Sequence, residues 1–451
     1  MADDRRCTLN LKSQIIRAGD DAAELEKLYK QAVIAGNETA FVEAIGQCAE
    51  DQPENILFSA WAYRLDVLPL PPPENGPRGQ SQTRRWRTAI ATSLVLGVMY
   101  ALFAGNGPPI PIPGESNPLF WIGWGPLTAL GILFFLTMVE RSERQFYGYA
   151  GLAVIPIALY TVLIAWSRTD DIAILSALHI PFAAWAAVGA ALILGHPDPA
   201  RQGFAFLVKS VETVLVGAIY FAAGAAFLGL TYGIFAVLGI DLPEDDLQTV
   251  ASWGIGAIPV LALASVYDPA AAPAAQDWTA GLTRILRILT QLILPLALGV
   301  LVVYVFWFIP AYFWRPFQER EVLIVYNFTI LAVLVLLTVV VSGPDGERSR
   351  RQDKILSYAV QALVGLILLL NVYALAAITS RTFNFGLTPN RYAVFGWNIV
   401  TLVMLAVIGF RQWKGRSEPW VFILRESIAR VTLLAVIWAL WVLIGLPLSF
   451  I

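Results

Sequence analysis

Long apolar stretches separated by short polar linkers fill the chain from about residue 86 to its end. Each stretch holds about 20 residues, the length that an α-helix needs to cross the roughly 30 Å hydrocarbon layer of a membrane. The stretches are continuous and do not alternate, so they do not fit the strands of a transmembrane barrel. The pattern predicts an all-α, polytopic transmembrane helix bundle of about 11 spans, at Trp86–Phe103, Leu119–Val139, Tyr147–Trp166, Ile172–Leu194, Val211–Ile240, Leu247–Val266, Ile285–Phe308, Val322–Val341, Ile355–Ile378, Tyr392–Phe410 and Val431–Leu448.

The first 68 residues are more polar and predict a small cytoplasmic helical module. In Ala22–Ala35 the apolar residues recur at helical spacing, and Thr39–Cys48 and Ile56–Leu65 are two further candidate helices. Prolines crowd the next segment, from Pro69 to Pro77, and favour a linker that is not helical. The expected domains are the module at 1–68, a Pro/Gly-rich linker at 69–85 and a transmembrane domain at 86–451.

Charge is sparse and unevenly placed in the membrane region. Of the 451 residues, 57% are hydrophobic and 14% are charged, and the formal net charge is −2. Fifteen Lys and Arg residues fall in or near the linkers after every second span, whereas the opposite linkers hold only five. Basic residues concentrate on the cytoplasmic side of a membrane. The asymmetry therefore predicts a cytoplasmic N-terminus, a C-terminus on the other side and, given the polar N-terminal region, no cleavable signal peptide.

Three helix–loop–helix segments of the membrane region resemble one another, at 202–266, 284–341 and 354–410. They would be parallel repeats, because each enters the membrane from the same side. Parallel repeats occur in transporters, and they also arise by simple duplication. Residues 417–427 are expected to form a separate short helix on the inner surface, because Ser417 and Pro419 resemble a helix start.

Polar side chains within the expected spans are the first class of candidate site residues. Lys209 and Glu212 stand three residues apart on one helix. They can neutralise each other at the membrane interface, or they can form a site for a coupling ion or an anionic group. Amides in later spans either hydrogen-bond neighbouring helices together or line a polar path. These amides are Gln291, Asn327, Gln361, Asn371 and Asn398.

Arginines in two linkers expected on the outer side belong to a second class of candidates. They run against the charge rule, so some contact must favour them there. Glu319 and Glu321 can pair with Arg381 or Arg391, and Thr388 can cap a helix whose first N–H groups suit an anion. The cluster is either a salt-bridge network that joins two hairpins or a pocket for an anionic ligand such as a lipid head group. It comprises Arg315, Glu319, Arg320, Glu321, Arg381, Thr388, Asn390 and Arg391.

Motifs for nucleotide, metal and nucleophile chemistry are missing from the sequence. It contains neither a phosphate-binding Gly-rich loop nor a nucleophile elbow, and its two histidines, His179 and His196, have no ligand partner at a metal-binding spacing. We therefore expect no catalytic residue, no metal and no cofactor, and no transport driven by ATP hydrolysis in this chain alone. Cys7 and Cys48 both fall in the N-terminal module, where we expect reduced thiols.

The segment between the last two outer arginines carries a family resemblance. Its run GLTPNRY, from Gly386 to Tyr392, lies between two apolar helices. It resembles an element of an uncharacterised bacterial multi-pass inner-membrane family, a domain of unknown function (number forty-one fifty-three). The resemblance covers roughly residues 85–450 and leaves the N-terminal module unaccounted for. It implies a fold of many spans and a bacterial inner-membrane location, but no activity and no catalytic residue.

Two functions fit these features best. A permease-like protein that handles lipids or an anionic solute fits the repeats, the amide-bearing spans and the outer arginines, although acids within the spans are scarce. A membrane-anchored scaffold or signal-coupled effector fits the N-terminal module, whose residues 1–68 would bind a cytoplasmic protein partner. A membrane enzyme ranks last, because the sequence offers no catalytic set. Membrane lipids are expected partners and nucleic acid is not, and the sequence does not indicate the oligomeric state.

Overall fold

The computed structural model describes residues 11–19, 21–34, 37–52, 55–65, 77–104, 118–139, 144–167, 170–194, 196–237, 243–276, 282–342, 350–415 and 419–450. Every regular element in these ranges is a helix, which confirms the expected all-α fold. The chain separates into two compact units, Met1–Ser81 and Gln82–Ile451.

The first unit is a small helical domain with a core of its own. After a helical stretch at 11–18, it contains α2 (Ala22–Ile34), α3 (Glu38–Asp51) and α4 (Ile56–Arg64). These bounds confirm the three helices expected from the sequence to within a few residues. The core includes Phe41, which packs against the rings of Tyr29 and Trp61. Cys48 is a free buried thiol in this core, and burial raises its pKa, so it is a structural cysteine.

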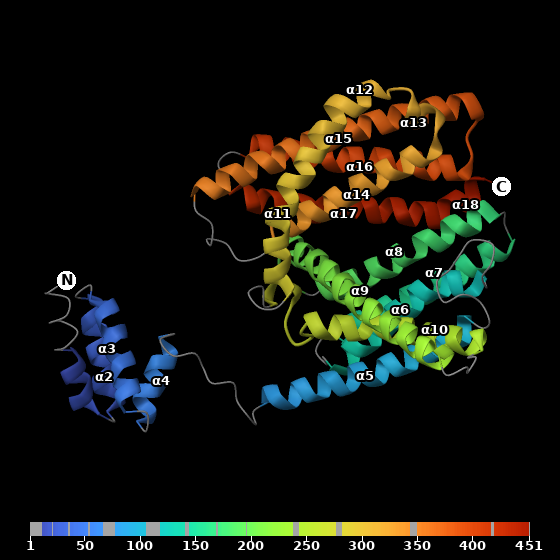
Figure 1. The fold of residues 1–451 in the computed structure, drawn as a ribbon. Helices are drawn as coiled ribbons and strands as arrows, with labels where there is room; N and C mark the ends of the chain where they lie inside the picture. The colour runs from blue at the N-terminus through green and yellow to red at the C-terminus, as the bar shows by residue number, and fades with distance from the viewer. Residues whose placement is uncertain are drawn as a thin grey trace. The chain divides into compact units, whose positions relative to one another are not determined.

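The second unit is a bundle of long helices (Figure 1). Its first six are α5 (Pro77–Ala104), α6 (Pro118–Val139), α7 (Arg144–Ser167), α8 (Asp170–Ile193), α9 (Pro199–Val237) and α10 (Glu244–Val266), followed by the short η1 (Pro273–Ala275). The remaining helices are α11 (Leu282–Val303), η2 (Tyr304–Phe308), α12 (Ile309–Ala311), α13 (Arg315–Gln318), α14 (Arg320–Val340), α15 (Arg350–Phe385), α16 (Pro389–Lys414), α17 (Trp420–Leu440), η3 (Trp441–Gly445) and α18 (Leu446–Ser449).

Ten helical segments of the described residues are long and apolar enough to cross a membrane. The remaining expected span, Tyr147–Trp166, corresponds to α7, whose described apolar stretch, Tyr147–Leu163, is shorter than the other ten. Apolar helices of this number and length make the chain a multi-span membrane protein. The predicted spans therefore each coincide with a helix, and some helices, such as α9, begin before the expected span.

Two elements differ from the expectations. Helix α5 begins at Pro77, inside the segment expected to be a non-helical linker. Proline is tolerated in a first helical turn because the N–H group that it lacks would have no helical partner there. A separate short helix was expected on the inner surface at 417–427. The structure instead has one continuous helical run from Trp420 to Ser449, so the last residues of that segment belong to the final span. Arg416, Ser417 and Glu418 lie outside the described residues.

The bundle divides into two groups of helices. Figure 1 shows α5–α10 gathered on one side and α11–α18 on the other. A hydrophobic cluster of the first group runs through α5, α6, α8 and α10 and includes Leu136 and Val260. A larger cluster of the second group runs through α11, α14, α15, α16 and α17 and includes Leu337 and Ile367. We call these the first and second groups, and we call the contact of α8 and α9 with α14, α16, α17 and η3 the seam.

Candidate functional site

The seam is the part of the membrane bundle where polar side chains from distant parts of the sequence meet. Helix α9 takes part in both hydrophobic clusters, because Phe206 packs into the first group while Phe204 and Val208 pack into the second. Smaller apolar clusters also join α8 to α16 and η3, around Ile172 and Ile180. The polar contacts therefore lie among apolar ones, and each of them must be satisfied inside the bundle.

Two hydrogen bonds join α8 to α16 across the seam. At the beginning of both helices, the Asn390 amide donates to Asp171 Oδ1 at 2.8 Å. Two turns further, the indole N–H of Trp397 donates to His179 Nε2 at 2.8 Å. The other ring nitrogen of His179 lies 2.7 Å from the carbonyl oxygen of Leu175. The two bonds follow each other in the same order along α8 and α16, with similar spacing, so these helices run in the same direction.

A buried ion pair lies on α9 near the other end of the seam. Lys209 Nζ is 2.8 Å from Glu212 Oε2, and the two residues are 5% and 1% exposed. Helical spacing places Glu212 on the same face as Phe204 and Val208, which is the face that packs into the second group. The pair is therefore inside the protein, whereas the sequence favoured a pair at the membrane interface.

Helix α17 contacts α9 immediately before this ion pair. The guanidinium of Arg425 lies over the ring of Phe204, 5.8 Å from its centroid, and its Nε donates to the carbonyl oxygen of Val341 at 2.8 Å. A Cβ built on Gly203 would lie 3.9 Å from the Cβ of Ala429. Arg425 thus connects α17 with both α9 and the end of α14, and the two groups approach each other closely at Gly203.

Four of the five amides expected in spans have described side chains, and three of them hydrogen-bond between helices. Asn398 on α16 donates to Asn327 on α14 at 2.9 Å, and Asn371 on α15 donates to Thr401 on α16 at 2.7 Å. Gln361 donates to Ser357 on its own helix, α15. The side chain of Gln291 lies outside the described residues. These contacts fit the structural interpretation, in which amides hold helices together.

The arginine-rich loops are arranged differently from the expected salt-bridge network. Glu319 pairs with Arg315 in its own turn, at 3.2 Å, and not with an arginine of the other loop. Arg381 instead donates to the carbonyl oxygen of Gln318 at 2.8 Å, which still joins the two loops. Arginine donors take carbonyl oxygens here because helix ends leave several of them without helical partners.

The GLTPNRY segment is held by its own arginine and threonine. Arg391 donates to the carbonyl oxygens of Phe385 and Gly386, each at 2.7 Å. Gly386 has a φ of 77°, a conformation that glycine adopts without strain. Thr388 caps α16 by accepting a bond from the Arg391 backbone N–H, as expected. The guanidinium and the cap thus both stabilise the start of α16.

Two other charged residues of the expected cluster, Arg320 and Glu321, are exposed at the start of α14.

A third charged cluster lies where α16 ends and α17 begins. Glu426 accepts from Arg411 and from Arg430. The amide of Gln412 donates to the carbonyl oxygen of Trp420 at 2.9 Å. These contacts tie the last turn of α16 to the first turns of α17, so they account for the charges structurally.

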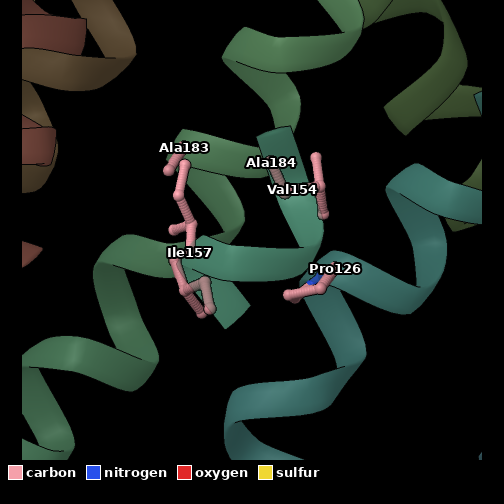
Figure 2. A pocket seen from close by; sticks show the side chains of 6 residues that line it. Pro126, Val154, Ile157, Ala183 and Ala184 are labelled. Atoms are coloured by element: carbon pink, nitrogen blue, oxygen red, sulfur yellow. The ribbon is translucent and has the colours of Figure 1, made fainter. Parts of the chain in front are cut away.

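The described pocket of the bundle is apolar. It lies between α6, α7 and α8 and is lined by Pro126, Val154, Ile157, Ile180, Ala183 and Ala184 (Figure 2). It is too narrow to hold a water molecule. Among the described residues, no group of His, Cys, Asp and Glu could hold a metal ion.

Sequence reasoning identified Lys209, Glu212 and Asn390 but missed three partners at the seam. Asp171, His179 and Trp397 come from two helices that are far apart in the chain. The position of His179 within an apolar span was the only signal available for it. Comparisons with protein family models, curated proteins and solved structures gave no match.

Proposed function

We propose that this membrane protein is permease-like and handles an anionic lipid or solute by movement of its two helix groups along the seam. The observation that carries the proposal is the buried Lys209–Glu212 pair on α9, the helix that contributes to the cores of both groups. Ionisable side chains inside a membrane bundle are costly, and they mark ion and substrate pathways in membrane proteins.

The ion pair offers the chemistry that such a protein needs. A lysine ammonium can bind a carboxylate or a phosphate once Glu212 has moved away or has taken up a proton. A pair that stays closed contributes little stability, because the loss of hydration offsets the attraction between the charges. Its burial on a helix between two groups therefore favours a role in function.

The polar contacts at the seam are few and individually weak, so the two groups could move apart there. Asp171–Asn390 and His179–Trp397 are single hydrogen bonds, and each is worth about 0.5–1.5 kcal/mol in net terms. Within the groups, by contrast, contacts are dominated by large apolar clusters. Separation of the groups would therefore break a few polar bonds and the small apolar clusters, and it would withdraw Phe204 and Val208 of α9 from the second core, while the rest of both main cores stays intact.

The location proposed with this function is a bacterial inner membrane, with the N-terminus in the cytoplasm. The excess of basic residues in alternate linkers supports the orientation, and the resemblance of the GLTPNRY segment supports the bacterial family. Membrane lipids would then surround the exposed apolar faces of helices such as α9 and α11.

Two variants, each with one engineered disulfide, test whether the seam moves. In a chain whose two cysteines, Cys7 and Cys48, are replaced by serine, Gly203→Cys with Ala429→Cys links the two groups. The 3.9 Å separation of the Cβ positions suits a disulfide, which needs about 3.5–4.5 Å. Gly217→Cys with Ala262→Cys is the matched control, because these positions are 3.8 Å apart on α9 and α10 of the same group.

We expect the disulfide across the seam to abolish movement of the probe, and the disulfide within the first group to leave it intact. The probes are fluorescent phosphatidylglycerol for the lipid case and labelled phosphate and succinate for the solute case, all in proteoliposomes. Before oxidation, the thiols introduced at the seam should also react with an impermeant maleimide. Complete protection of these thiols, together with equal activity of both locked proteins, would contradict the proposal.

The second candidate function is a membrane-anchored scaffold or signal-coupled effector. It is favoured by the independent core of the first unit, which would bind a cytoplasmic protein through residues 1–68. A scaffold does not need a movable seam. It therefore predicts the protected thiols that would contradict the permease-like function.

A further inference from the structure

We propose that His179 is a proton-binding latch, which holds α8 to α16 while its ring is neutral and releases α16 when the ring is protonated. The geometry at both ring nitrogens carries this inference. It deepens the permease-like function, because the latch lies on the seam, but the protonation itself can be measured without any transported molecule.

The hydrogen bonds of His179 require one neutral form of the ring. The carbonyl oxygen of Leu175 can only accept, so Nδ1 must carry the proton of the 2.7 Å bond. The indole N–H of Trp397 can only donate, so Nε2 must be the unprotonated acceptor of the 2.8 Å bond. A second proton on Nε2 would set two donors against each other and remove the bond to Trp397.

Burial and ring packing hold the imidazole of His179 in place for its hydrogen bond with Trp397. His179 is 6% exposed, and its ring stacks on that of Trp397 with centroids 5.9 Å apart. Phe182 packs against both rings. A cation formed at this buried position would lose most of its hydration, so the ring must turn or the helices must separate.

Charged and titratable groups occur on several of the elements packed against α8, the helix that carries His179. Asp171 on α8 accepts from Asn390, and Lys209 pairs with Glu212 on α9. The described side chains of α6 and η3 include no titratable group. The remaining groups on α7, α9, α16 and α17 are Tyr147, Tyr149, Tyr160, Arg201, Tyr220, Tyr232, Arg391, Tyr392, Arg411, Lys414, Arg425, Glu426 and Arg430. Among the described residues, none of these groups forms an ion pair with His179, so no carboxylate pairs with a protonated ring there.

The sign of the pH dependence follows from the hydrogen bonds. The neutral ring makes both bonds, so the latch is closed at higher pH. As pH falls, protonation removes the acceptor of Trp397, and the contact between α8 and α16 weakens. The neighbouring Asn390–Asp171 bond would then be the remaining polar contact between these two helices among the described residues.

Two tryptophan variants test the latch by thermal unfolding of the full chain in nanodiscs. Trp397→Phe removes the donor to His179. Trp185→Phe is the matched control, because Trp185 also lies in the bundle but donates to the hydroxyl of Ser210, 3.0 Å away, which does not titrate. We expect Trp397→Phe to lower the unfolding temperature by about 2 °C at about pH 8 and to have little effect at about pH 5. Trp185→Phe should cost the same at both pH values.

Nitrogen-15 spectra of histidine in the unmodified protein give a second, independent measurement. The chain has two histidines, and a His196→Gln variant assigns their signals. We expect the His179 ring to hold its proton on Nδ1 at about pH 8 and to become doubly protonated at about pH 5. A ring that stays neutral at the lower pH, or a Trp397→Phe cost that is the same at both pH values, would overturn the latch. If His179 takes up a second proton but the protein transports none of the probes, the permease-like function would be contradicted and the latch would not.

Discussion

Lys209 and Glu212 show, at the scale of the residue, how an ion pair inside a membrane protein differs from one at its surface. Both side chains are almost fully buried, so neither charge can be left alone without a large loss of hydration energy. The pair neutralises itself within one turn of α9, at 2.8 Å. Its stability therefore depends on both partners being present, and not on either residue by itself.

A double-substitution cycle at this pair separates a structural role from a functional one. Glu212→Gln or Lys209→Met alone should destabilise the protein by about 3–5 kcal/mol, because each removes one member of a buried ion pair and keeps the other charge inside the bundle. The two changes together should restore most of the loss, because no charge remains. Thermal unfolding in nanodiscs measures both effects.

The same proteins decide whether the pair is needed for activity. If the permease-like function is correct, the double variant is stable but moves no lipid or anion in proteoliposomes. A stable double variant with full activity would show that the pair only fills space in the bundle. Equal stability of both single variants and the parent would instead show that the charges are hydrated.

At the scale of the helix, α16 and α17 illustrate how small residues set the distance between two spans. A Cβ added at Gly396 would lie 1.8 Å from Cζ2 of Trp438, which no side chain can accommodate without movement. Gly409, on the same helix, is different, because its Cβ would lie 3.5 Å from Val364, an ordinary contact. Close packing therefore excludes a side chain at Gly396, whereas there is room for one at Gly409.

We expect Gly396→Ala to destabilise the protein by about 1–3 kcal/mol, because the Trp438 ring and α17 must shift. Gly409→Ala is the control, and it should be neutral or stabilise slightly, because alanine favours a helix over glycine by about 1 kcal/mol. Unfolding by heat or denaturant in nanodiscs measures the difference. Equal stabilities of the two variants would contradict the close packing of Gly396 on Trp438.

The sequence predicted the helices well and their ends less well, for a physical reason. Apolar stretches fix where a helix crosses the membrane, but a helix can continue past them into polar surroundings at little cost. Helix α9 begins at Pro199 and α15 extends to Phe385, both beyond their expected spans. Helix α5 likewise begins at Pro77, before its expected span. The run that begins at Trp420 is one helix where the sequence predicted two, because proline starts a helix as readily as it ends one.

At the scale of the whole molecule, the seam could not be derived from the sequence. Its hydrogen bonds join positions more than 200 residues apart, such as His179 and Trp397. A periodic pattern shows that a polar residue lies in a span, but not which other span it faces. For this reason Lys209 and Glu212, which are close in sequence, were predicted as a pair, whereas the partners of Asn390 and His179 were not.

The division of the chain into two units gives the last prediction. The first unit has a core of its own around Phe41, which is fully buried between Tyr29 and Trp61. We therefore expect deletion of residues 1–68 to leave the membrane bundle folded, as a single peak in size-exclusion chromatography. Phe41→Ala in the full chain should destabilise the first unit by about 3–5 kcal/mol, through the cavity that it creates.

Two separate unfolding transitions are the signature of this arrangement. Because a cavity acts only on the core that contains it, Phe41→Ala should lower the midpoint of one transition and leave the other where it is in the parent protein. The deletion should remove the first transition entirely. If the substitution moved both transitions together, or if the shortened protein aggregated, the bundle would depend on the N-terminal unit for its stability. The N-terminal unit would then be a structural part of the membrane domain, and the case for it as a detachable receiver of a cytoplasmic partner would be lost.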